Sequence, residues 1–123
     1  MVSPGNFIYH MCTLTEWLAA EEEGFYNGSS QDVADGFIHF STLEQIAESA
    51  AKHRTGQTGL VLLSVDPGLL GDALKWEKSR GGALFPHLYG PLPVAAVTDS
   101  RDLPLGENGR HQFPEGFPEG TGG

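Results

Sequence analysis

Asp35-Gly36-Phe37-Ile38-His39-Phe40-Ser41-Thr42 is the stretch of sequence that decides the fold of this chain. Its apolar run predicts a strand over residues 36–40 with a histidine in the middle. Side chains alternate between the two faces of a strand. If Ile38 and Phe40 point into the core, His39 lies on the opposite, partly polar face, which is typical of the wall of a cleft.

The residues that follow this strand have the pattern of a helix start. Ser41-Thr42-Leu43-Glu44 fits a capping box, in which a serine hydroxyl and a glutamate satisfy backbone N–H groups at a helix N-terminus. We therefore interpret Ser41 as an N-cap. The free N–H groups near Ser41 and Thr42 are predicted to meet a phosphate.

Working outward in both directions gives the rest of the expected structure. Strands are predicted at residues 7–11, 36–40, 59–65, 73–78 and 93–98, and the apolar run at 59–65 suits a strand buried on both faces. Two N-terminal helices are predicted, one from the Thr13 capping box to Gly24 and one from Ser41. Residues 25–34 are predicted to be irregular, because Asn27-Gly28-Ser29-Ser30 is turn chemistry. The order of elements predicts an α+β domain with a small mixed or split sheet.

The chain of 123 residues is long enough for one domain, which we place at residues 1–105. From residue 106 onward glycine and proline are frequent and little is left to bury. Residues 106–123 are therefore predicted to form a flexible C-terminal tail.

Composition excludes several classes of function. The formal net charge of −9 disfavours nonspecific binding to nucleic acid or to an anionic membrane. Cys12 is the only cysteine, so neither an intramolecular disulfide nor a cysteine-based zinc site is expected. No apolar run approaches the roughly 20 residues that span a bilayer. The N-terminus lacks the pattern of a secretory signal, so we expect a cytoplasmic protein without membrane partners.

Three of the five histidines are predicted to line one cleft. His10 lies in the first strand, His39 in the second, and His87 in the Pro/Gly-bounded segment Phe85-Pro86-His87-Leu88-Tyr89-Gly90. The alternative for each is a structural histidine whose nitrogens are satisfied by the protein. His53 and His111 are predicted to be surface residues.

Together these segments resemble the bacterial family known as domain of unknown function 952. The motifs that carry the resemblance are Ile8-Tyr9-His10, Gly36-Phe37-Ile38-His39-Phe40-Ser41, the leucine-rich strand ending at Asp66, Trp76-Glu77 and Phe85-Pro86-His87-Leu88-Tyr89-Gly90, and they span residues 7–103. The resemblance implies a fold similar to that of ADP-ribosyltransferases, with a split pair of small sheets around a nucleotide cleft. It therefore also implies NAD as a ligand.

The resemblance assigns candidate roles to individual residues. His10 matches a first-strand position that contacts the nucleotide, and His39 with Ser41 matches a second-strand motif beside the nicotinamide. Glu77 matches a later acid at the reacting centre. The candidate ligand-binding residues are His10, His39, Ser41, Thr42 and Tyr89, and the candidate catalytic residues are Glu77 and His87.

The leading hypothesis is a small protein whose His-lined cleft binds NAD or a related nucleotide and acts in ADP-ribosyl transfer or NAD processing. Whether it is an enzyme stays open at this point. One alternative is a non-catalytic ligand-sensing or protein-interaction module. The other is a metal-dependent hydrolase with His10, His39 and His87 as ligands, but no metal is expected because the chain has no His-x₃-His or His-Glu-x-x-His spacing.

Overall fold

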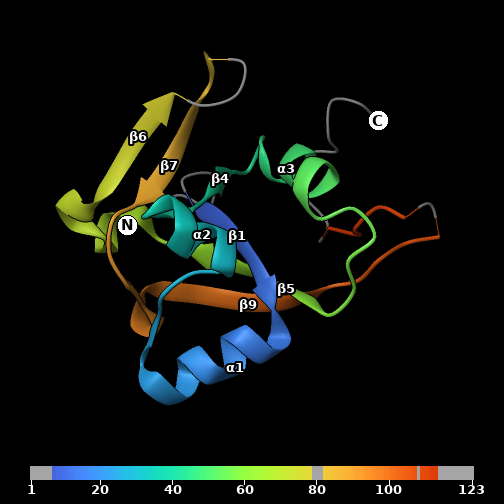
Figure 1. Ribbon diagram of the computed structural model, residues 1–123, viewed down its shortest axis with the longest axis horizontal. Coiled ribbons are helices and arrows are strands. Elements are labelled where there is room, and N and C mark those ends of the chain that lie inside the picture. Colours follow the sequence, from blue (N-terminus) through green and yellow to red (C-terminus); the bar gives the residue numbers. More distant parts are fainter. Residues whose placement is uncertain (1–6, 79–81, 108, 114–123) are drawn as a thin grey trace.

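The computed structural model describes residues 7–78, 82–107 and 109–113 (Figure 1). Within these residues the helices are α1 (Leu14–Glu23), α2 (Ser30–Asp35) and α3 (Ile46–His53). The strands are β1 (Ile8–Thr13), β2 (Phe25–Tyr26), β3 (Ile38–His39), β4 (Ser41–Thr42), β5 (Leu60–Val65), β6 (Leu74–Lys78), β7 (Leu84–Leu88), β8 (Leu92–Pro93) and β9 (Val97–Leu103). Short 3-10 turns occur at Pro67–Leu69, Gly71–Ala73 and Val94–Ala96.

The strands form three separate sheets. The central sheet has the order β4-β1-β5-β9, a second sheet has the order β3-β7-β6, and β2 pairs with β8. All of the pairings between described strands are antiparallel. Figure 1 shows β6 and β7 rising away from the central sheet, with α1 below that sheet and α3 at its other end. The α+β class is confirmed, but the sheets are antiparallel rather than mixed.

The two middle strands of the central sheet, β1 and β5, are buried on both faces. Every residue of β5 is buried, which confirms the prediction from its continuous apolar run. Alternate residues of β1 and β5 contribute to two clusters of buried side chains. One cluster lies towards α1 and the β3-β7-β6 sheet (Ile8, Cys12, Trp17, Ala20, Tyr26, Ile38, Phe40, Val61, Leu63, Val65, Leu88, Leu92, Ala96). The other lies under α3 (Tyr9, Met11, Ile46, Ala50, Leu60, Leu62, Leu103).

Two of the predicted helix boundaries are confirmed at α1. Thr13 and Glu16 form the reciprocal bonds of a capping box, with the Glu16 N–H donating to Thr13 Oγ1 and the Thr13 N–H donating to Glu16 Oε1. Gly24 ends the helix with a φ of 92°, a left-handed conformation that glycine adopts without steric cost.

The prediction of two N-terminal helices is wrong, because the chain forms α2 between the other two. The helix predicted to open at Ser41 opens instead at Ile46, with Gln45 at the N-cap position. Ser41 and Thr42 form β4 and pair with β1. Ser41 pairs with Tyr9 of β1 in an extended conformation, and the Thr42 N–H and carbonyl oxygen bond to Gln45, so the Ser-x-x-Glu pattern at residue 41 does not become a cap.

The segment after β9 returns to the body of the protein. Leu105 and His111 form an isolated antiparallel bridge, and His111 Nε2 lies 2.8 Å from the Gln57 carbonyl oxygen. Phe113 packs against the cluster under α3. His111 is buried, so the prediction that it is a surface residue is wrong. Residues 114–123 of the predicted tail lie outside the described residues.

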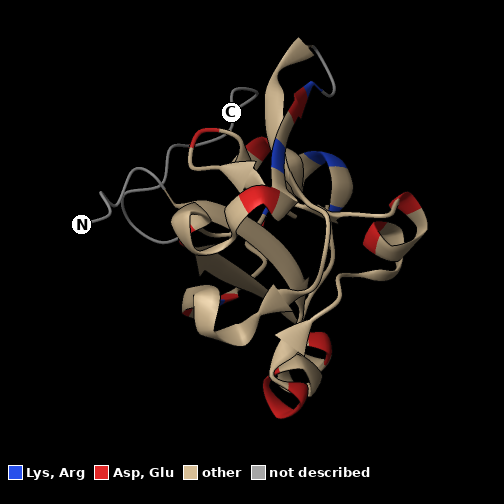
Figure 2. Cartoon of the chain, turned by 90° about the vertical axis from the view of Figure 1, so that its left-hand side faces the viewer, with Lys and Arg blue, Asp and Glu red and all other residues tan. Residues whose placement is uncertain are grey.

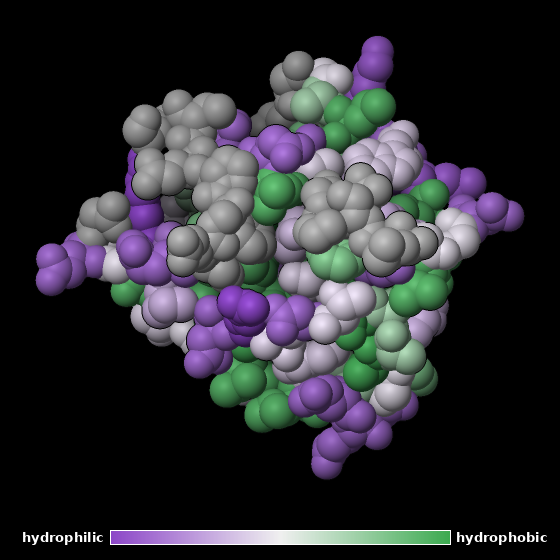
Figure 3. Space-filling model, turned by 180° about the vertical axis from the view of Figure 1, so that it is seen from behind, coloured by the Kyte–Doolittle hydropathy of each residue, from purple (hydrophilic) through white to green (hydrophobic). Residues whose placement is uncertain are grey.

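The surface carries charge of mainly one sign. In the view of Figure 2, Asp and Glu segments are spread from the top of the molecule to α1 at its foot, whereas Lys and Arg segments lie in the upper half. Figure 3 shows hydrophobic and hydrophilic surface interleaved on the back of the molecule. Among the described residues, no helix is long and apolar enough to cross a membrane.

The burial of Cys12 leads to a first testable prediction. Cys12 is fully buried, and burial raises the pKa of its thiol to about 12. Because the thiolate is the reactive form, Ellman's reagent should modify the native protein roughly a thousand-fold more slowly than the urea-unfolded protein. As the chain has one cysteine, absorbance reports this thiol alone. Rapid stoichiometric modification of the native protein would contradict the burial.

Candidate functional site

Asp32 is a buried acid at the centre of the candidate site. Its carboxylate accepts hydrogen bonds from the Ser29 N–H at 2.8 Å, from the His39 N–H at 3.2 Å and from His39 Nδ1–H at 2.5 Å. Burial on its own would raise the pKa of Asp32, but these bonds and the nearby His10 ring outweigh it and hold the pKa at about 2. Asp32 is therefore a buried carboxylate that fixes the position of His39.

Asp32 can lie close to β3 only because residue 28 is a glycine. Gly28 has a φ of 98°, and a Cβ built on it would lie 2.7 Å from Asp32 Cβ and 3.2 Å from Ile38 Cγ1. A larger residue at this position would push α2 away from β3 as well as straining the backbone. Ser29 then caps α2, because its hydroxyl accepts from the Asp32 N–H.

His39 contacts a carboxylate through each of its ring nitrogens. Nδ1 donates to Asp32, and Nε2 lies 3.0 Å from Asp35 Oδ2 at the other end of α2. The two contacts hold the ring against α2 at both of its nitrogens. The side chain is 40% exposed, so this histidine is both held by the protein and accessible to a ligand.

His10, on β1, holds the backbone of His39 in place. The ring is 4% exposed, its Nδ1–H donates to the His39 carbonyl oxygen at 2.6 Å, and Nε2 accepts from the Tyr26 hydroxyl at 2.8 Å. Burial lowers the pKa of His10, with the Asp32 charge opposing the shift. Because both nitrogens bind protein groups, His10 positions the backbone of His39.

A second histidine–carboxylate pair lies on the neighbouring strands. His87 Nδ1–H donates to Glu77 Oε1 at 2.8 Å, and the Tyr89 hydroxyl donates to the same oxygen at 2.7 Å. The Tyr89 and His87 hydrogen bonds lower the pKa of Glu77. The two predicted catalytic residues and the predicted ligand-binding Tyr89 therefore form one cluster on β6, β7 and the residue after β7.

The two histidine–carboxylate pairs are adjacent. His39 and His87 are direct partners in the antiparallel pairing of β3 with β7, and their ring centroids are 5.5 Å apart at an interplanar angle of 70°. The Phe37 ring stacks on His87 at 4.2 Å and contacts the His39 ring at 4.6 Å. Strand register and one aromatic ring thus hold the two imidazoles side by side.

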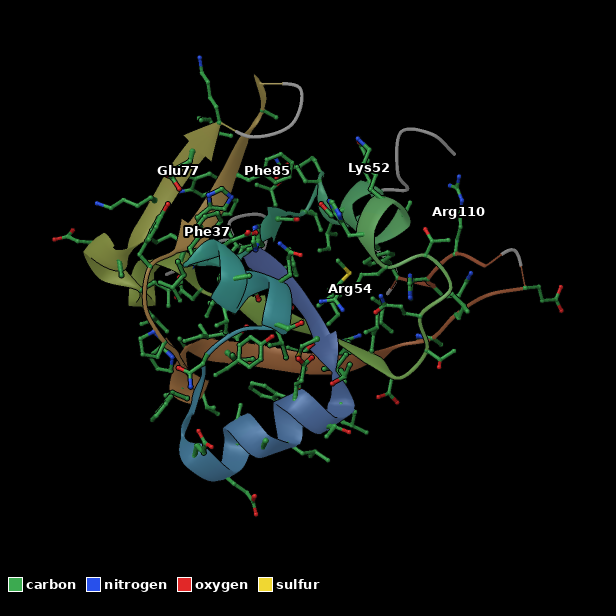
Figure 4. All side chains as sticks on the ribbon, viewed as in Figure 1. Phe37, Lys52, Arg54, Glu77, Phe85 and Arg110 are labelled. Atoms are coloured by element: carbon green, nitrogen blue, oxygen red, sulfur yellow. The ribbon has the colours of Figure 1, made fainter. Side chains whose placement is uncertain are left out.

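A cleft of about 600 Å³ begins at His39 and extends under α3. Asp32, Asp35 and His39 line it from α2 and β3, Phe85 lines it from β7, and His53 and Arg54 line it from the C-terminal end of α3. Figure 4 shows Phe37, Glu77 and Phe85 around the β6–β7 sheet and Arg54 between β1 and α3. The lining of the cleft therefore includes two carboxylates, both from α2, and one guanidinium, from the residue after α3.

Ser41 and Thr42 have positions that sequence patterns did not anticipate. Ser41 lines the cleft but is buried, with its hydroxyl 2.9 Å from Ser49 Oγ of α3. The Thr42 N–H donates to Gln45 Oε1 at 2.9 Å. The helix start predicted at these two residues is wrong, because α3 begins four residues after β4 ends.

The predicted site residues come together in a chain rather than around one point. His10 contacts the backbone of His39, and the ring of His39 contacts that of His87. Across residues 7–78, 82–107 and 109–113, no group of three or more His, Cys, Asp or Glu side chains is placed to hold a metal ion. The engagement of both His10 nitrogens explains why the three imidazoles do not form such a group.

Sequence analysis missed two members of the site. Asp32 fell in the segment predicted to be irregular, although Ser29-Ser30-Gln31-Asp32 has the spacing of a capping box. Arg54 is at the C-cap position of α3 and is not among the predicted site residues. Its guanidinium binds the Met11 carbonyl oxygen and Gln57 Oε1, and it lines the cleft through the packing of α3 on β1, which no local pattern signals.

Comparison with protein families identifies the chain's relatives. The family model described as "Protein of unknown function (DUF952)" matches residues 11–100. The chain belongs to the DUF952 family. Its match to the DUF952 model confirms the resemblance seen in the sequence motifs, and residues 11–100 include His39, His87 and Asp32.

Solved structures similar to this DUF952 protein come from Caulobacter crescentus. The X-ray crystal structure of protein CC0527 is 53% identical, covers 86% of this chain and 93% of its own, and superposes with a TM-score of 0.84. The solution NMR structure of CC0527 is 52% identical over 87% of this chain and 92% of its own, with a TM-score of 0.78. A search of curated proteins gives no match.

Proposed function

We propose that the cleft binds NAD or a related nucleotide, and that the protein acts on its N-ribosyl bond in ADP-ribosyl transfer or NAD processing. The observation that carries this proposal is the division of charge in the cleft. Asp32 and Asp35 line it from α2, and Arg54 lines it from the C-terminal end of α3. NAD⁺ has the matching division, with a cationic nicotinamide at one end and a pyrophosphate towards the middle.

The size and shape of the cleft support a ligand of this class. Its volume of about 600 Å³ falls within the range of small-molecule sites, roughly 300–1,000 Å³. Arg54 uses two N–H groups on protein oxygens, and a guanidinium has five, so other donors can meet a phosphate. Phe85 also lines the cleft and supplies an aromatic side chain that can contact a planar ring.

The carboxylates that line the cleft suit the chemistry of an N-ribosyl bond. Cleavage of this bond passes through a transition state that resembles an oxocarbenium ion, and nearby carboxylates stabilise its positive charge. Asp35, held against His39, is an exposed carboxylate in the lining of the cleft, and Glu77, which is outside that lining, is the acid of the neighbouring pair. The ligand contacts fall to His39, Arg54 and Phe85, with His10 and Ser41 in supporting positions.

A titration followed by two-dimensional amide NMR tests the ligand. We expect saturable shifts from NAD⁺ at α2, β3 and the C-terminal end of α3. Arg54→Gln should weaken binding about ten-fold or more, because one hydrogen bond to a charged group contributes roughly 1.5–3 kcal/mol. The matched control is Arg101→Gln, which removes the same charge from an exposed site on β9 and should leave affinity unchanged. Absence of shifts at millimolar NAD⁺, or equal losses in both variants, would contradict the proposal.

A further inference from the structure

Strand β6 is the open edge of the β3-β7-β6 sheet. One side of β6 pairs with β7, and within residues 7–78, 82–107 and 109–113 no strand pairs with its other side. Figure 1 shows β6 as the outer strand of the hairpin that rises from the body of the protein. A regular strand with an unpaired edge is a template on which another extended chain can pair.

The register of the hairpin shows which backbone groups of β6 face β7. In an antiparallel pair, every second residue directs both its N–H and its C=O group to the partner strand. The Tyr89 N–H donates to the Ala73 carbonyl oxygen at 2.8 Å, which makes Ala73 and Tyr89 a pair of this kind. Counting in steps of two along β6, Lys75 and Glu77 also direct their backbone groups to β7.

The alternate residues of β6 face the open side. Trp76 and Lys78 direct their N–H and C=O groups away from β7. Leu74 directs its C=O group the same way, while its N–H bonds to Gly71 in the preceding turn. The Trp76 side chain is 46% exposed. The open edge therefore offers donors and acceptors that no described strand takes up, beside an exposed indole ring.

The sequence of β6 is complementary to itself in the antiparallel direction. It reads Leu74-Lys75-Trp76-Glu77-Lys78. With a two-fold axis at Trp76, the indole rings of two copies lie opposite each other, and Lys75 of each copy lies opposite Glu77 of the other. Aromatic pairs and pairs of opposite charge both stabilise antiparallel strands when they lie directly across from each other. An axis at Lys78 would instead place two ammonium groups opposite each other.

The charges of β6 select a second copy of the chain as the partner. Lysine on an edge strand usually prevents pairing with other strands. Here Lys75 is two residues from Glu77, so an antiparallel copy of the same strand matches both charges. Glu77 Oε1 accepts from His87 and Tyr89, and no described residue is hydrogen-bonded to Oε2. Glu77 can therefore bind the lysine of another copy and keep its own contacts.

We propose that the protein forms a two-fold symmetric dimer in which β6 pairs with β6 of a second copy. The two three-stranded sheets then become one continuous sheet. The Trp76 N–H donates to the Trp76 C=O of the other copy, and the Lys78 N–H donates to the Leu74 C=O, each twice by symmetry. The pairing places Lys75 of each copy beside the Glu77–His87 pair of the other, and it does not depend on what the cleft binds.

Exchanging the charges of β6 tests this register in the full chain. Lys75→Glu places two glutamates opposite each other at both pairs, and Glu77→Lys places two lysines there. In sedimentation velocity, each variant alone should dimerise at least about ten-fold more weakly than the wild type, because attraction becomes repulsion at both pairs. An equimolar mixture of the two variants should regain about the wild-type affinity, because both pairs again have opposite charges. Lys52→Glu, the same charge reversal at an exposed position of α3, is the matched control and should leave dimerisation unchanged.

Amide hydrogen exchange of the wild-type chain, followed by NMR, tests the pairing without a substitution. The N–H groups of Trp76 and Lys78 should exchange at least about ten-fold more slowly in the dimer than in the dilute monomer. Those of Lys75 and Glu77, which bind β7, should exchange slowly at every protein concentration. This alternation is specific to pairing at the open edge of β6.

Three results would overturn the proposal. One is a wild-type protein that stays monomeric at millimolar concentration. Another is a dimer in which the Trp76 and Lys78 amides exchange as fast as in the monomer, because a different face then forms the contact. The third is a mixture of the Lys75→Glu and Glu77→Lys variants that dimerises no better than each variant alone, with melting temperatures showing that both are folded.

Discussion

Replacing Asp32 by Asn should lower the free energy of unfolding by about 3 kcal/mol at pH 7, the scale expected when one member of a buried charged pair is removed. Asp32 accepts from Ser29 and from two groups of His39, and its side chain is 3% exposed. An asparagine of the same size has one acceptor oxygen, so its amide would point a donor at another donor. Urea unfolding at pH 7 measures the difference.

Asp35→Asn is the matched control for this change. It removes the same charge from the same helix, but the Asp35 side chain is 36% exposed and has one contact with His39. Exposed pairs of this kind contribute less than about 1 kcal/mol. If both variants lose the same stability, the hydrogen bonds at Asp32 are not what holds α2 to β3.

The low pKa of Asp32 should make the free energy of unfolding depend on pH in the acidic range. Its pKa in the folded protein is about 2, below its ordinary value of 3.8, so the unfolded chain takes up the proton first as the pH falls. This contribution, about 2 kcal/mol at 1.36 kcal/mol per pKa unit, is fully present above about pH 4 and is lost as the pH falls towards 2. Asp32→Asn should therefore have a flatter stability profile between pH 4 and 2.

Phe40→Ala should cost about 3–5 kcal/mol of unfolding free energy, the range for truncating a buried aromatic side chain. Phe40 is 2% exposed, and its ring centroid lies 5.6 Å from that of His10. It follows β3 directly and packs between the central sheet and the β3-β7-β6 sheet, so its loss leaves a cavity where the sheets meet.

Phe25→Ala provides the comparison within the same protein. Phe25 is 43% exposed on β2, so its truncation should cost no more than about 1 kcal/mol. Urea unfolding of both variants measures the two losses of unfolding free energy. Similar losses for the two phenylalanines would mean that the junction of the sheets is not tightly packed.

Sequence patterns located the elements whose signals are local. The continuous apolar run of β5 and the capping box of α1 both predicted what the structure contains. The same capping pattern at Ser41 failed, because a strand partner competes for those backbone groups and one sequence carries no sign of that partner. Helix α2 has six residues, which is too short for a periodic apolar face to emerge.

Strand β7 was not predicted as a strand because it contains Pro86. A proline disrupts a central strand by removing a donor. Here the Phe40 N–H donates to the Pro86 carbonyl oxygen, and β3 ends one residue earlier at His39. The backbone nitrogen and carbonyl of one strand residue point to the same side, so the missing donor of Pro86 faces the place where the pairing stops.

The sequence predicted some residues of the candidate site but not their partners. His39 and His87 could be identified because residue type and the alternation of polar and apolar residues can be read from a short stretch of sequence. Their carboxylate partners depend on strand register and on the position of α2, which are set by contacts between residues far apart in the sequence. The position of Arg54 follows from the packing of α3 on β1 in the same way.

The register of β3 against β7 also sets which changes of chain length this fold can accept. Ile38 opposes Leu88 and His39 opposes His87, so inner and outer residues alternate in step on the two strands. Deleting one residue between Gly36 and Phe40 would turn an imidazole into the core and expose an isoleucine, while every side chain kept its identity. Insertions and deletions should therefore be damaging in these two strands, where the count of residues matters as much as their chemistry.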